Sequence, residues 1–191
     1  MRADPLSWWI SEFTSVAPVG HVLRAHLHER WTRFHSLPES KRYAENQSEY
    51  VELLNRHLSV ASELFHLGET IYVYRSHLGE KKLKGRHKHQ IAGRLLRETL
   101  LKLCAGAHTS EAEDDHYFVR ALTTTWIPDF FEVLTRQVAD WKESGITFVA
   151  PSTRNIYSPY DGGMDVFAFS VSPSVLEGKF RSWMSEREDR L

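Results

Sequence analysis

Hydrophobic residues recur at intervals of three or four along several stretches of the chain, and this spacing predicts amphipathic helices. The clearest helix follows Asn46, which forms a capping-box pattern with Glu49, and it extends to Gly68, a residue type that commonly ends helices. Asp4 and Pro5 form a helix-start pair for a short helix that extends to about residue 13. Further helices are predicted over 18–28, 90–104 and 128–145, and from 173 onward.

Other stretches alternate in polarity or are rich in β-branched and aromatic residues, as is typical of strands. Residues 31–36 alternate so that Trp31, Arg33 and His35 lie on one face, and Pro38 ends this strand. Further strands are predicted over 70–75, 116–126, 146–150, 155–158 and 165–171.

The order of these elements indicates the fold class. Helices and strands alternate early in the chain, whereas strands follow one another late. We therefore expect one α+β domain over residues 31–185, with a mixed, mostly antiparallel sheet covered by helices. Residues 1–30 form an N-terminal helical segment packed on or flanking this domain, and 186–191 form a charged tail.

Tryptophan is plentiful, with six residues, and its placement bears on function. Trp141 shares a face of the predicted 128–145 helix with the apolar residues Phe131, Leu134 and Val138. Trp8 and Trp9 are adjacent, so one of them could stay exposed and anchor a protein interface.

Charge, cysteine content and hydrophobicity limit which classes of protein this chain could belong to. The chain has 24 basic and 25 acidic residues, and a net charge near zero argues against attraction of the whole molecule to nucleic acid or an anionic membrane. Cys104 is the single cysteine, so no intrachain disulfide forms. No apolar run approaches the roughly 18 residues of a membrane span, and the N-terminal residues lack a signal-peptide core. We expect a cytoplasmic protein without a membrane partner.

The first candidate site is the polar stretch RFHSLPESKRY, residues 33–43. Cations that converge at a strand end could hold a phosphate or carboxylate, and His35 could then act as general acid or base. Alternatively, Arg33 and Arg42 pair with nearby carboxylates and only tie the loop down. The candidate binding residues in this stretch are Arg33, His35, Ser36, Lys41, Arg42 and Tyr43.

The second candidate site is the segment PYDGGMD, residues 159–165. In a functional interpretation, Asp161 and Asp165 lie beside the basic stretch and supply a base or an orienting carboxylate. Alternatively, the segment is an ordinary β-turn, in which Gly162 and Gly163 permit positive φ.

Residues 81–97 contain a basic run, KKLKGRHKH, followed by two arginines. Clustered cations can neutralise nucleic-acid phosphates, but few aromatic residues are interleaved here, and the acidic residues 111–115 could neutralise the run. The two histidines of HKH could bind zinc only weakly, and HExxH, GxSxG, Walker and GxGxxG motifs are absent. We expect no metal and no cofactor.

Two stretches together resemble a bacterial family known only as a domain of unknown function. They are RFHSLPESKRYAENQSEYVELLNRH with ELFHLGETIYVYR, and NIYSPYDGGMDVFAF. The resemblance covers roughly 31–75 and 116–170 and implies a bacterial source and a shared fold. It also implies that the candidate residues of both sites, with the two glycines, match a family pattern, but it supplies no mechanism.

We expect a protein-binding or accessory, immunity-like module, because no catalytic or metal motif is recognised and aromatic residues are abundant. The alternative is a hydrolase or transferase for a phosphorylated or carboxylated small molecule. In that case Arg33, Lys41 and Arg42 hold the anion, His35 is the acid or base, and Asp161 orients it. The second alternative is nucleic-acid binding through 81–97.

Overall fold

A computed structural model describes residues 4–14, 16–78, 90–91, 94–95, 97–104 and 116–187. The helices are α1 (Pro5–Phe13), α2 (Gly20–His26), α3 (Gln47–Leu64), α4 (Pro128–Ala139) and α5 (Pro173–Lys179), with short 3-10 turns at His28–Arg30 (η1), Pro38–Ser40 (η2) and Arg181–Trp183 (η4). The strands are β1 (Trp31–His35), β2 (Thr70–Leu78), β3 (Gln90–Ile91), β4 (Arg94–Leu95), β5 (Arg97–Cys104), β6 (His116–Thr125), β7 (Ile146–Val149), β8 (Ile156–Tyr160) and β9 (Gly163–Phe167).

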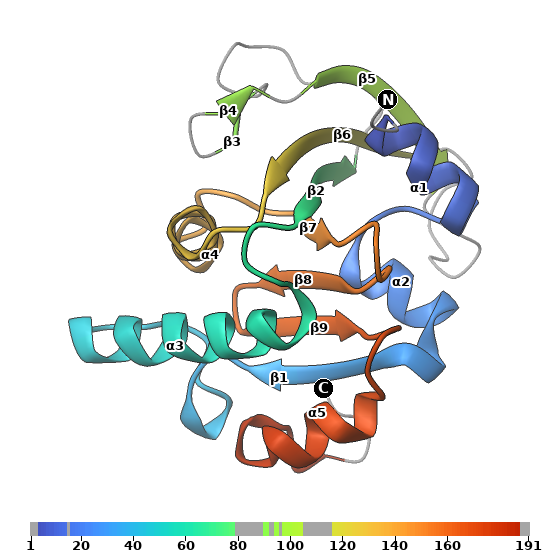
Figure 1. Ribbon diagram of the computed structural model, residues 1–191. Coiled ribbons are helices and arrows are strands. Elements are labelled where there is room, and N and C mark those ends of the chain that lie inside the picture. The colour runs from blue at the N-terminus through green and yellow to red at the C-terminus, as the bar shows by residue number, and fades with distance from the viewer. Residues whose placement is uncertain are drawn as a thin grey trace.

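Seven strands form one sheet in the order β1-β9-β8-β7-β2-β6-β5, which Figure 1 shows from bottom to top. Strands β3 and β4 pair separately as a two-stranded sheet. Every pairing among the described strands is antiparallel. The expected α+β fold with a mostly antiparallel sheet is therefore confirmed.

Each face of the sheet is covered by helices (Figure 1), and each has its own hydrophobic core. Residues of α3, α4 and α5 cover one face, where Phe34 of β1 is fully buried. Helices α1 and α2 cover the other face, so the N-terminal segment packs on the domain. Trp9 is fully buried in this second core, and Trp8 packs against its edge on Tyr72, so neither is the exposed anchor that the sequence allowed.

Local sequence signals determine where the main helices begin. The side chain of Asp4 accepts a hydrogen bond from the backbone N–H of Ser7, and Asn46 caps α3 by accepting one from the N–H of Glu49 at 3.0 Å. Both bonds satisfy donors that a helix N-terminus leaves unpaired. None of the described helices is long and apolar enough to cross a membrane.

The predicted helix over 90–104 is wrong, because β5 occupies most of that segment and pairs with β6. A run of leucines is compatible with either structure, and the long strand β6 offers an edge that only a strand can extend.

The predicted helix over 128–145 is too long, so Trp141 does not share a helix face with Phe131 and Leu134. Helix α4 ends at Ala139, and Trp141 then adopts a left-handed conformation with φ of 60°. The helical periodicity therefore stops before Trp141, and its side chain is 68% exposed.

Candidate functional site

The two candidate stretches lie side by side in the sheet. Strand β1 pairs with β9, so that Arg33 is opposite Asp165 and His35 is opposite Gly163. Gly163 does not have a positive φ. A glycine is required there because a Cβ would lie only 2.3 Å from the carbonyl oxygen of Phe34. The fold thus brings both stretches together, but it divides their side chains into separate groups.

The first group is a buried ion pair. Arg33 Nε lies 2.9 Å from Asp165 Oδ1, and its Nη2 lies 3.3 Å from Oδ2. The indole N–H of Trp31 donates to the same Oδ1 at 2.8 Å, and the ring of Tyr160 lies under the guanidinium. Since Asp165 is only 3% exposed, this group is a buried ion pair that joins the edge strand β1 to its neighbour β9.

The Arg33–Asp165 pair also borders a cavity of about 530 Å³ beside the start of α2. A Cβ on Gly20 would lie 2.7 Å from Asp165 Oδ2, so the helix approaches the carboxylate closely. His21 bonds through Nε2 to the hydroxyl of Tyr117 at 2.9 Å across this cavity. Burial, followed by the charge of Arg24, lowers the pKa of His21, while Asp165 opposes the shift.

The second group is a chain of buried hydrogen bonds on the opposite face of the sheet. Ser36 Oγ lies 2.7 Å from His57 Nε2, and the hydroxyl of Tyr157 lies 2.5 Å from His57 Nδ1. The neutral ring donates a proton through one of its two nitrogens and accepts one through the other, so it bridges Ser36 and Tyr157. Burial lowers the pKa of His57 to about 3, so the ring is neutral at pH 7.

The third group consists of surface ion pairs. Lys41 Nζ lies 2.9 Å from Glu45 and 2.8 Å from Glu49. Arg42 Nη2 lies 2.9 Å from Asp161, and the hydroxyl of Tyr43 makes a long bond of 3.5 Å to the same carboxylate. Asp161 therefore forms an ion pair with Arg42 and a hydrogen bond with Tyr43.

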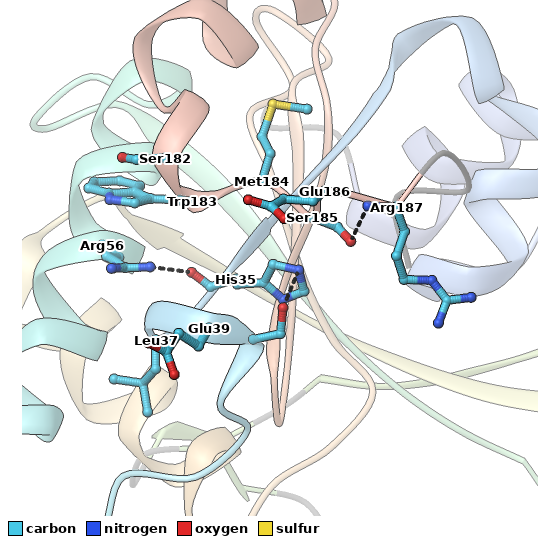
Figure 2. A pocket seen from close by; sticks show the side chains of 11 residues that line it. His35, Leu37, Glu39, Arg56, Ser182, Trp183, Met184, Ser185, Glu186 and Arg187 are labelled. Carbon is cyan, nitrogen blue, oxygen red and sulfur yellow. Dashed lines mark hydrogen bonds between the residues drawn. The ribbon is translucent and has the colours of Figure 1, made fainter.

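His35 faces a separate cavity of about 440 Å³, lined also by Ser40, Arg56 and Trp183 (Figure 2). Its Nε2 lies 3.2 Å from the hydroxyl of Ser40. Burial, then the charges of Arg33 and Arg56, lower the pKa of His35, and the backbone of Gly162 opposes this. The ring is therefore neutral at pH 7 and able to accept a proton.

Sequence reasoning missed Ser40, Arg56 and His57. Ser40 looked like part of a polar turn, whereas Arg56 and His57 lie on the buried face of α3, where the periodicity argument counted only apolar residues. The one available signal was a pair of polar residues at positions that the helical spacing assigns to the buried face.

The basic run and the histidines His87 and His89 lie outside the described residues, as does most of 81–97. Within the part of the chain that the structure describes, no three His, Cys, Asp or Glu side chains gather as metal ligands.

The fold and these groups define a single α+β domain in which a buried ion pair joins the edge strand β1 to its neighbour β9. A family model matches residues 19–188, and the chain therefore belongs to DUF3885, a domain of unknown function. No curated protein and no solved structure matches the chain.

Proposed function

We propose that this protein is an accessory module that binds another protein through the Trp141 surface, formed by Arg42, Tyr43, Trp141 and Lys142. The observation that carries the proposal is the side chain of Trp141, which is 68% exposed although its backbone has a φ of 60°. A left-handed conformation costs a residue with a Cβ about 1 to 2 kcal/mol. Glycine is the residue that usually occupies this place after a helix.

The surface around Trp141 has the composition of a binding hot spot. The rings of Trp141 and Tyr43 lie 5.7 Å apart, and Tyr43 is itself 41% exposed. The guanidinium of Arg42 lies over the ring of Tyr43 at 5.9 Å. Tryptophan, tyrosine and arginine are the residue types that dominate binding energy at protein interfaces.

The charges of the surface indicate which partner fits. Arg42 is 63% exposed and its carboxylate partner Asp161 only 21%. Lys142 is 69% exposed and its partner Asp140 only 18%. Both cations therefore point outward over shielded carboxylates, and a partner with an acidic rim around an apolar centre complements them.

Trp141→Gly is the variant that tests the proposal. Relief of the left-handed strain offsets loss of the half-exposed ring pair with Tyr43, so we expect the free energy of unfolding to change by less than about 1 kcal/mol. A loss of more than about 2 kcal/mol would show that Trp141 serves packing instead. Urea unfolding measures this difference.

The binding assay starts with affinity capture from cells that produce the protein, followed by calorimetry with the purified partner. Trp141→Gly is expected to weaken binding by about 30-fold or more, as for a hot-spot residue. Leu67→Ala is the matched control, since Leu67 is 78% exposed and lies outside this surface. Equal affinity of wild type and Trp141→Gly for every purified candidate, or an equal loss in the control, contradicts the proposal.

A further inference from the structure

The turn that carries Ser40 is strained. Glu39 and Ser40 are consecutive residues other than glycine with φ of 55° and 57°. A positive φ is unfavourable for any residue with a Cβ, and strain of this kind persists only where the surrounding structure holds it. Here Leu37, which is 1% exposed, anchors one side of the turn, and Lys41 anchors the other side through two glutamates.

This strained turn places the Ser40 hydroxyl against His35. The distance from Ser40 Oγ to His35 Nε2 is 3.2 Å. In the tautomer with its proton on Nδ1, Nε2 accepts the hydroxyl proton of Ser40. A hydroxyl beside a base is the arrangement of an activated nucleophile.

The same cavity contains a buried cation. The side chain of Arg56 is only 7% exposed, with Nε 2.6 Å from Glu52 and the guanidinium over the ring of Trp183. Nη1 makes a long bond of 3.5 Å to the carbonyl oxygen of His35, drawn in Figure 2. Arg56 lines the cavity, so its guanidinium is a donor that a ligand there can reach. A carboxylate on a ligand fits this donor.

We propose that this cavity is a hydrolytic site for small carboxylic esters that carry a second carboxylate, with Ser40 as nucleophile, His35 as base and Arg56 as the binding group for the carboxylate. A cavity of about 440 Å³ suits such a molecule, and Trp183 and Met184 offer it apolar contact. The inference is independent of the Trp141 surface.

The reaction balances without a cofactor. Ser40 Oγ forms a bond to the ester carbon while His35 Nε2 takes its proton. The bond to the leaving alcohol then breaks, and His35 returns the proton to the alcohol oxygen. Water attacks the acyl-enzyme with the same proton transfer to His35, which frees Ser40 and releases the carboxylic acid.

The first test is covalent labelling with diisopropyl fluorophosphate, in which Ser40 Oγ replaces fluoride on phosphorus. Peptide mass spectrometry is expected to find the adduct on Ser40 of the wild type, and no adduct in Ser40→Gly or His35→Gln. Ser40→Gly relieves the left-handed strain, so it is expected to fold at least as stably as wild type. Ser182→Ala is the matched control, because Ser182 lines the same cavity. A wild type without an adduct at Ser40 overturns the proposal.

The second test compares p-nitrophenyl hydrogen succinate with p-nitrophenyl butyrate, which lacks the second carboxylate. Wild type is expected to hydrolyse the succinate ester faster, and Ser40→Gly to lose about 100-fold or more of that rate. Arg56→Met keeps an unbranched side chain over Trp183 and is expected to lose the preference between esters while still hydrolysing the butyrate. An unchanged rate in Ser40→Gly, or equal preference in wild type and Arg56→Met, contradicts the assignment.

Discussion

Acidification is expected to destabilise this protein through His57. The ring is completely buried between Ser36 and Tyr157, and burial lowers its pKa from 6.5 to about 3. An unfolded chain therefore binds a proton at His57 between pH 6.5 and 3 that the folded chain does not bind. Stability is then fully present above pH 6.5 and is lost as the pH falls toward 3.

The size of the effect follows from the pKa difference. Each unit of pKa corresponds to about 1.36 kcal/mol, so the loss across this range is roughly 4 to 5 kcal/mol. Since small domains unfold with only about 5 to 15 kcal/mol, this single residue accounts for a large part of the acid sensitivity. His21 and His35, whose pKa values are lowered less by partial burial, contribute in the same direction.

Urea unfolding from pH 7.5 to 4 separates the contribution of His57 from the others. His57→Gln loses hydrogen bonds to Ser36 and Tyr157, so it is expected to be roughly 1 to 3 kcal/mol less stable than wild type at pH 7.5. Because glutamine does not titrate, this difference is expected to shrink as the pH falls. His66→Gln, at an exposed histidine, is expected to follow wild type at every pH. Parallel curves for wild type and His57→Gln would refute the reasoning.

Two further predictions concern the ion pair between β1 and β9 and the turns. Asp165→Asn leaves the buried guanidinium of Arg33 without its carboxylate and is expected to cost roughly 3 kcal/mol, whereas Asp161→Asn, in a surface pair, is expected to cost less than about 1 kcal/mol in urea unfolding. Equal losses would contradict a structural lock. Gly68→Ala, with φ of 84° and open space around it, is expected to cost about 1 to 2 kcal/mol by the same measurement. Gly145→Ala is expected to cost more, because its Cβ would lie 2.0 Å from a backbone carbonyl oxygen; a smaller loss would contradict this.

The helix starts, the strand identities outside 90–104 and the α+β class could be predicted from the sequence, because capping residues and residue periodicity act locally. The segment 90–104 could not, since its leucines suit a helix or a strand and pairing with β6 decided between them. Trp141 was misplaced for a related reason. Periodicity predicts the face on which a side chain lies only while the helix continues, and α4 ends at Ala139.

For the candidate site, the sequence by itself determined that two polar stretches, 33–43 and 159–165, contain groups able to pair or to bind anions. Only the tertiary structure decided what each group does, because pairing of β1 with β9 placed Arg33 on Asp165 and left His35 to a different cavity. The partners of His35, which are Ser40 and Arg56, come from a turn and a helix. Burial and charge at such a junction depend on chain segments distant in sequence, which no local pattern encodes.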